Sequence, residues 1–178
     1  GPACYNKGGM RPTVTDANVV LGFIDPEYFL GGKFDIRPDY AQNVVGDIAE
    51  QLSVTNEEAA FAIYTTANHN MVAAIEEITV REGLNPRDSM FVCGGGATAL
   101  HIADMADILG LKRYMIPRFM AGLSAFGGLI SDIRREDSAV LLTNSAKFDV
   151  QSVNAALARL KKSGDEFLVG AGVKNENR

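Results

Sequence analysis

A strand-like run, three consecutive glycines and the start of a helix follow one another in residues 88–101, Asp-Ser-Met-Phe-Val-Cys-Gly-Gly-Gly-Ala-Thr-Ala-Leu-His. Glycines let a backbone approach a ligand closely, and the free N–H groups at a helix start favour anions. The turn is therefore predicted to bind a nucleotide or a phosphate group. The candidate binding residues are Gly94, Gly95, Gly96 and Ala97.

Two other interpretations of this glycine turn stay open. Gly94, Gly96 and Ala99 fit the dinucleotide pattern G-x-G-x-x-A, but a Rossmann site also has an acidic residue about 20 positions later. This chain has Pro117 and Arg118 there, and Arg118 could accept the 2′-phosphate of NADP. Alternatively, the glycines only allow a helix to pack closely against a strand.

Two histidines offer imidazole groups. His101 falls one turn into the helix expected after the glycines, where it could serve as a general base or ligand. A partly buried structural histidine explains it as well. His69 lies between Asn68 and Asn70 inside a predicted helix, as expected for a helix edge that faces solvent or another subunit.

Asp16 and Asn18 offer oxygen ligands that suit Mg²⁺, although capping of a helix explains Asp16 without a metal. A reactive Cys4 thiolate would need a cationic neighbour, and Lys7 is the local candidate. Cys93 ends an apolar strand and is expected to be a small buried residue. These residues leave the catalytic groups unidentified.

The composition is that of a globular domain: 178 residues, 47% hydrophobic and 22% charged. The formal net charge of −5 argues against a nucleic-acid partner. No apolar run approaches the ~20 residues that a membrane span needs. The two cysteines show neither metal-ligand spacing nor a disulfide framework, so the chain is expected in the cytoplasm.

Helices dominate the predicted elements that position these groups. The longest is expected at 55–82, because Thr55 and Glu58 form a capping box, apolar residues recur at three- and four-residue steps, and Gly83 ends it. The other expected elements are helices at 16–23, 38–52, 97–109, 119–131 and 149–162, and strands at 90–93, 113–116 and 136–143.

A strand–helix–strand unit at the centre of a helix-rich chain predicts the α/β class. Residues 1–178 are expected to form a single domain that belongs to a longer subunit. Within it, residues 1–12 have loop composition, and residues 170–178 form a polar tail.

Several segments resemble the hydantoinase A/oxoprolinase family in order and spacing. Residues 1–32 begin Gly-Pro-Ala-Cys-Tyr-Asn-Lys-Gly-Gly-Met-Arg-Pro-Thr-Val-Thr-Asp-Ala-Asn and end Phe-Leu-Gly-Gly. The resemblance continues through Asn70-Met71, Asn85-Pro86-Arg87-Asp88, the glycine turn with His101, Leu123-Ser124-Ala125-Phe126-Gly127, and Ser131-Asp132.

The resemblance implies the actin-like ATPase fold of sugar kinases and Hsp70 chaperones, in which two domains close over ATP. The glycine turn is similar to the adenosine motif of that fold, so Gly94, Gly95, Gly96 and Ala97 would lie against the nucleotide, with His101 and Arg118 as further candidates. Asp16 would help to hold Mg²⁺ or another divalent metal. The small-residue helix at 119–131 looks like one of the two helices that move past each other during domain closure.

Family members couple ATP hydrolysis to the opening of a cyclic amide or imide, and relatives carboxylate ketones such as acetone or acetophenone. They pair this kind of subunit with a hydantoinase B-type partner. The family's usual turn, Gly-Gly-Ala-Gly-Pro-Leu-His, is Gly-Gly-Gly-Ala-Thr-Ala-Leu-His in this chain, which resembles the ketone carboxylases more.

The phosphate motif of the fold, Asp-x-Gly-x-Thr, is absent from this sequence, as is its second phosphate loop. The chain is therefore expected to be part of the C-terminal actin-like half, without the N-terminal half and inactive alone. Three functions follow as hypotheses: an ATP-dependent cyclic amidohydrolase, a ketone carboxylase, or a scaffold segment whose long helix docks a partner subunit.

Overall fold

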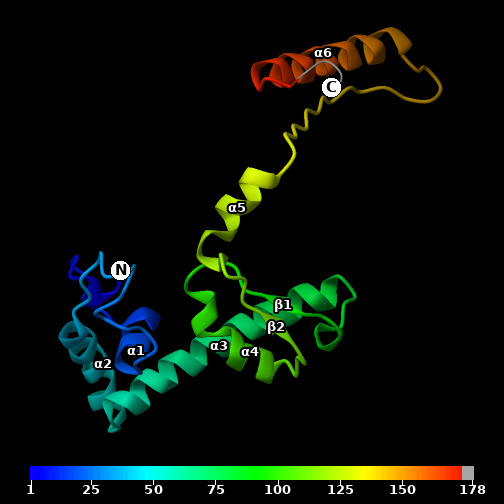
Figure 1. The fold of residues 1–178 in the computed structure, drawn as a ribbon. Coiled ribbons are helices and arrows are strands. Elements are labelled where there is room, and N and C mark those ends of the chain that lie inside the picture. Colours follow the sequence, from blue (N-terminus) through cyan, green and yellow to red (C-terminus); the bar gives the residue numbers. More distant parts are fainter. Residues whose placement is uncertain (174–178) are drawn as a thin grey trace. The chain divides into compact units, whose positions relative to one another are not determined.

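The computed structural model describes residues 1–173, drawn in Figure 1. The chain forms two compact units, Gly1–Phe126 and Gly127–Arg178. Helices, with one short parallel pair of strands, make it a helix-rich α/β chain, as predicted. The expectation that residues 1–178 form part of one domain stays a prediction.

Three helices build the N-terminal part of the first unit: α1 (Val14–Val20), α2 (Pro38–Leu52) and α3 (Asn56–Arg81). The bounds of α2 are those predicted, and the predicted capping box of Thr55 and Glu58 begins α3. Helix α1 begins and ends earlier than predicted. The three helices pack on one another through small buried side chains, which let their backbones approach closely: Ala17, Val45, Ala49, Ala59 and Ala60.

A small β-α-β element completes the first unit. Strand β1 (Phe91–Val92) runs parallel to β2 (Tyr114–Met115), with α4 (Ile102–Ile108) between them in the chain. Both strands are shorter than predicted because each has only one partner within the described residues. Short 3₁₀ turns fill the connections: η1 (Ala3–Tyr5), η2 (Pro86–Asp88), η3 (Thr98–Leu100) and η4 (Met120–Gly122).

The continuous helix predicted at 97–109 is wrong. Residues 98–100 form the 3₁₀ turn η3, and α4 begins only at Ile102. The Thr98 hydroxyl donates to the carbonyl of Gly94 at 2.8 Å, which tightens the turn. His101, between the two elements, is held by side chains from α1 and α3, and these contacts override the local helical pattern.

The second unit contains α6 (Val150–Gly170), and α5 (Leu123–Ile130) lies across the division between the units. Helix α6 extends well beyond the predicted end at residue 162. The strand predicted at 136–143 is wrong: no strand forms there, and Val140 and Leu142 are 94% and 97% exposed. An apolar run cannot make a strand when no other strand lies beside it. Of the predicted tail, residues 174–178 lie outside the described residues.

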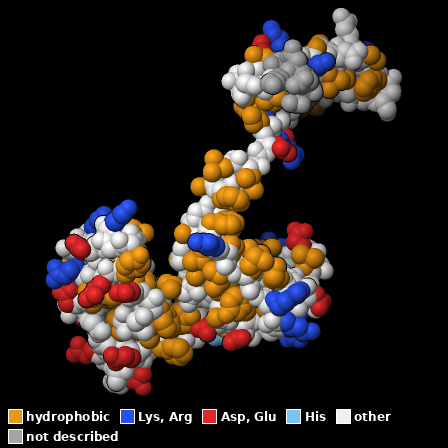
Figure 2. All heavy atoms as spheres, viewed as in Figure 1, with side chains coloured by type: hydrophobic (Ala, Val, Ile, Leu, Met, Phe, Trp, Pro, Cys, Tyr) orange, Lys and Arg blue, Asp and Glu red, His pale blue; other side chains and the backbone are white. Residues whose placement is uncertain are grey.

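Large hydrophobic side chains also remain exposed on both units (Figure 2). They include Phe61 and Ile78 on α3 and Leu129 on α5. None of the helices in the described part of the chain is long and apolar enough to cross a membrane.

Candidate functional site

A cavity of about 570 Å³ lies in the first unit, between the N-terminal thirty residues and the glycine turn. Aromatic and aliphatic side chains form most of its wall, with Tyr5, Phe23 and Phe29 among them. Gly96, Ala97 and Leu100 line the other side. No Lys or Arg is among its described lining residues. The described lining includes one acidic residue, Asp25, so the cavity does not suit an anion.

Three buried polar side chains from three elements meet beside this cavity. Nδ2 of Asn18 on α1 lies 3.3 Å from Nε2 of His101, and Nδ1 of His101 lies 2.7 Å from Oδ1 of Asn68 on α3. Asn18, His101 and Asn68 are 3%, 6% and 1% exposed. Asn18 and His101 line the cavity, while Asn68 stands behind the imidazole.

His101 is held as a neutral imidazole. Burial lowers its pKa below the ordinary value, and the negative charge of Asp104 offsets only part of this effect. With the Asn68 oxygen facing Nδ1, the matching tautomer carries its proton on Nδ1, and Nε2 then accepts from Asn18. The ring also stacks on Tyr64, with centroids 4.9 Å apart, and the Tyr64 hydroxyl donates to the Leu100 carbonyl.

Only one of the two polar atoms of the Asn18 side chain has a hydrogen-bond partner among the described residues. Its amide nitrogen is engaged by His101, but its Oδ1 is buried and accepts no hydrogen bond from the described residues. Buried polar atoms without a partner are rare in folded proteins and call for an explanation, and an absent ligand is one such explanation.

Within the glycine turn, Gly94 and Gly95 contact other parts of the protein, whereas Gly96 has open space beside it. Gly95 has φ +90° and donates its N–H to the Met120 carbonyl at 2.8 Å. A Cβ on Gly94 would lie 3.1 Å from Leu123 Cδ2, whereas a Cβ on Gly96 would meet no atom within 4 Å. Of the four predicted turn residues, only Gly96 and Ala97 line the cavity.

Asp16 forms a separate buried centre. Its Oδ1 accepts the Cys4 N–H at 2.8 Å, and its Oδ2 accepts the N–H of Ala3, and the N–H and hydroxyl of Thr13. Burial alone would raise the pKa of Asp16, but these hydrogen bonds outweigh it and lower the pKa below its usual value. The carboxylate thus completes the capping box with Thr13 at the start of α1 and fastens residues 3 and 4 to this helix.

The residues present do not fit a magnesium ion at Asp16. Its oxygens are engaged by protein donors, and the described residues contain no group of three or more His, Cys, Asp or Glu side chains that could hold a metal. The metal-ligand role of Asp16 stays a prediction.

The other singled-out residues lie outside the cavity. Arg118 is exposed. Burial, with a smaller effect of Asp16, raises the pKa of the Cys4 thiol to about 12, so the thiol is unreactive. Lys7, its expected activator, lies over the Phe34 ring instead. Cys93 is buried, as predicted, and His69 is exposed on α3.

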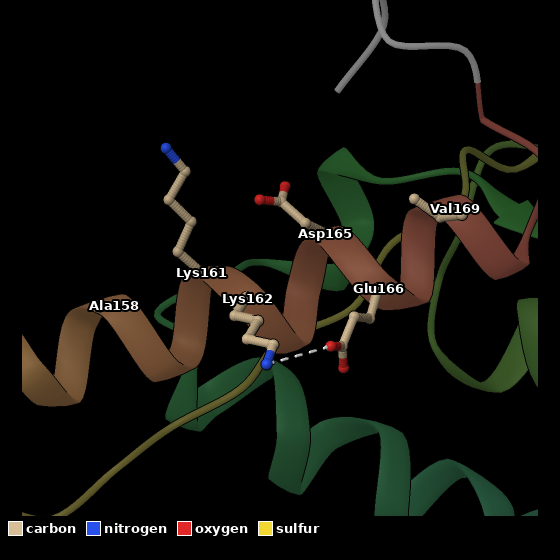
Figure 3. A pocket seen from close by; sticks show the side chains of 6 residues that line it. All are labelled: Ala158, Lys161, Lys162, Asp165, Glu166 and Val169. Atoms are coloured by element: carbon tan, nitrogen blue, oxygen red, sulfur yellow. Dashed lines mark ion pairs between the residues drawn. The ribbon is translucent and has the colours of Figure 1, made fainter.

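A second hollow, on α6, carries no constellation for chemistry. Figure 3 shows that its lining side chains all project from this one helix. Lys162 and Glu166 pair along the helix at 3.8 Å and are both exposed, so this is an ordinary solvated ion pair.

Comparisons with known proteins find similarity to one family of enzymes. The Hydantoinase/oxoprolinase family profile matches residues 1–137. The caprolactamase alpha subunit of Pseudomonas jessenii is 36% identical over 100% of this chain and 26% of its own length. The 5-oxoprolinase 1 of Arabidopsis thaliana is 34% identical over 75% of this chain and 12% of its own length. The acetophenone carboxylase gamma subunit of Aromatoleum aromaticum is 38% identical over 59% of this chain and 14% of its own length.

Solved structures agree with the sequence relatives. The crystal structure of the ATP-dependent caprolactamase from Pseudomonas jessenii has a TM-score of 0.67 and 36% identity, covering 94% of this chain and 25% of that chain. Nucleotide-free acetone carboxylase has a TM-score of 0.69 at 24% identity, over 92% and 24% of the two chains, and supports the fold alone. The chain thus spans about a quarter of the length of its first relatives.

Proposed function

The chain belongs to the hydantoinase/oxoprolinase family, and from this premise we propose that it forms part of an enzyme that opens a cyclic amide or imide with hydrolysis of ATP. The observation that carries the proposal is the 36% identity to a caprolactamase alpha subunit over the whole chain. One related solved structure is that of an ATP-dependent caprolactamase.

Part of an adenine nucleotide fits the residues present. A planar uncharged base could enter the cavity beside Gly96 and Ala97, where Gly96 has no Cβ and the described lining has no Lys or Arg. Phosphates do not fit there, because the described lining has no Lys or Arg and the sequence has no Asp-x-Gly-x-Thr motif. When bound, ATP would supply the phosphoryl group that makes hydrolysis of a stable amide favourable.

The phosphate-gripping residues then come from another region or subunit, which is consistent with an actin-like fold of two lobes. Relatives are named as subunits, and the chain spans 26% of the caprolactamase alpha subunit. We therefore place an N-terminal half and a hydantoinase B-type subunit among its partners, and expect no turnover by the isolated 178-residue chain.

A ketone carboxylase is the second candidate. Residues 94–101, with Thr98 and Ala99 in the turn, favour it, as does the 38% identity to the acetophenone carboxylase gamma subunit. In that reaction bicarbonate would be the co-substrate.

ATP hydrolysis by the complete complex distinguishes these functions. We expect phosphate release that depends on a lactam such as caprolactam or 5-oxoproline and is unchanged by bicarbonate. Release that requires both a ketone and bicarbonate would establish the carboxylase instead. Robust lactam-dependent turnover by the isolated chain would contradict the division of the site between two regions.

A further inference from the structure

Asn18, which lines the cavity beside the glycine turn, carries a buried oxygen without a hydrogen-bond partner among the described residues. We propose that this cavity binds a planar, uncharged group whose N–H donates to Asn18 Oδ1. The inference rests on the proposed function only for the choice of probes; the site itself is argued from the described residues.

The orphaned oxygen is the first support. A buried acceptor left without a partner costs about 1–3 kcal/mol, so its retention at the wall of a cavity points to a partner that arrives from outside. In the structure, Asn68 Oδ1 faces Nδ1 of His101 and Asn18 Nδ2 faces Nε2, so the Asn18 oxygen is the atom left without a partner.

The shape and charge of the cavity are the second support. Its wall is largely aromatic and aliphatic, and its described lining has no Lys or Arg. Asp25, the acidic residue among the described lining residues, is exposed to solvent, and burial lowers the pKa of His101. Tyr28 and Leu30 are 72% and 66% exposed beside it, and Leu30 has φ +52°, a conformation that branched side chains rarely adopt. Apolar side chains presented in this way would cover a flat ligand.

Two ligand groups share this chemistry. The ring N–H of a cyclic amide is one, and the 6-amino group of adenine is the other. Both are planar, uncharged and able to donate to an amide oxygen. The cavity lies against Gly96, so either could be the occupant.

Matched ligand pairs distinguish the two groups without any substitution in the protein. Affinities are measured by titration calorimetry on the complete enzyme, with a non-hydrolysable ATP analogue so that no turnover is needed. One pair is caprolactam and N-methylcaprolactam; the other is the ATP analogue and its purine counterpart without the 6-amino group. We expect about a tenfold loss of affinity in one pair, the value of one hydrogen bond to a buried acceptor. Equal affinities within both pairs would overturn the proposal.

Substitutions then assign the effect to Asn18. Asn18→Leu should bring the two affinities within the sensitive ligand pair to near equality. Asn18→Asp keeps an oxygen acceptor, so the ligand with the N–H should still bind more tightly than its counterpart without it. Thr15→Val is the matched control, because it removes another polar group from the same cavity wall without touching Oδ1, and its ratio should equal that of the wild type. A ratio unchanged in Asn18→Leu would overturn the proposal. Should Asn18→Leu not fold, the ligand pairs and Asn18→Asp still decide.

Failure of the proposed function is a separate result. An enzyme without lactam-dependent ATP hydrolysis can still show the binding ratio, and an active enzyme can lack it.

Discussion

Asp16 and Asn18 lie two positions apart on α1, and both are buried, yet their surroundings are opposite. The Asp16 carboxylate accepts hydrogen bonds from three backbone N–H groups and one hydroxyl. Asn18 gives one hydrogen bond to His101 and leaves its oxygen without a partner. A saturated polar group holds a fold together, whereas an unsaturated one at a cavity is available to a ligand. We therefore expect Asp16 to contribute to stability and Asn18 to ligand binding.

The same division recurs in the glycine turn. Gly95, with its positive φ and its hydrogen bond to Met120, is fixed by the fold, whereas Gly96 faces open space at the cavity. Neighbouring residues of one motif therefore have different roles, and substitutions can separate them.

Asp16→Ala is expected to have the largest effect on stability. It would leave buried N–H groups of Ala3 and Cys4 without acceptors and break the capping box that Asp16 forms with Thr13, so we expect a loss of about 3 kcal/mol or more. Urea denaturation of the chain measures this. A loss under about 1 kcal/mol would mean that water replaces the carboxylate and that the centre does not hold the N-terminal segment.

Gly95→Val and Gly96→Val sharpen the comparison within the turn. Valine at φ +90° is strained, so Gly95→Val should cost about 1–3 kcal/mol in folding free energy. Gly96→Val should change stability little but fill part of the cavity and weaken ligand binding by the complete enzyme.

Subunit assembly provides the control for the glycine pair. If Gly96→Val impairs assembly while ligand affinity stays intact, the segment acts as a scaffold and the cavity is not a binding site. Gly96→Ala, which adds only a methyl group, should lie between the wild type and valine in affinity.

Asn18→Leu should change stability by about 1 kcal/mol or less. It removes one hydrogen bond to His101 but also removes an acceptor that has no partner, and these effects oppose each other. A thermal melt compared with that of Asp16→Ala tests the ranking. A cost for Asn18→Leu as large as that for Asp16→Ala would place Asn18 in the fold rather than in a site.

The pH dependence of stability should show both centres in separate ranges. The folded-state pKa of His101 is below its ordinary value of 6.5, so the unfolded chain binds a proton first and stability falls as pH drops below about 6.5. The pKa of Asp16 is below 3.8, so its contribution is present above that pH and is lost only below it. Denaturation midpoints between pH 8 and pH 3 test this, with His101→Gln expected to remove only the first decrease. A first decrease that persists in His101→Gln would contradict the neutral, buried state of the imidazole.

Local signals predicted where the helices α2 and α3 begin. The Thr55 capping box and the proline at the start of α2 act within a few residues, so the sequence alone locates those helix starts. Residues 136–143 have the apolar composition of a strand, but a strand also needs a neighbour, and Val140 finds none in the described residues. Predictions failed where a distant partner decides the outcome.

The candidate site follows the same rule. The glycine turn and His101 could be identified from the sequence, and Asn18 was singled out, though as a metal ligand. The meeting of Asn18 with His101, which lie 83 positions apart, depends on tertiary packing. The sequence offers one signal for Asn68: it follows the apolar Tyr64 by four residues, which places it on the same, buried face of α3.

A crystal structure of the complete enzyme with caprolactam and a non-hydrolysable ATP analogue tests the central claim most directly. We expect a nitrogen of one of these ligands to lie within hydrogen-bond distance of Asn18 Oδ1, in the cavity beside Gly96. A cavity filled by side chains from the rest of the enzyme, with a protein donor on Oδ1, would contradict it.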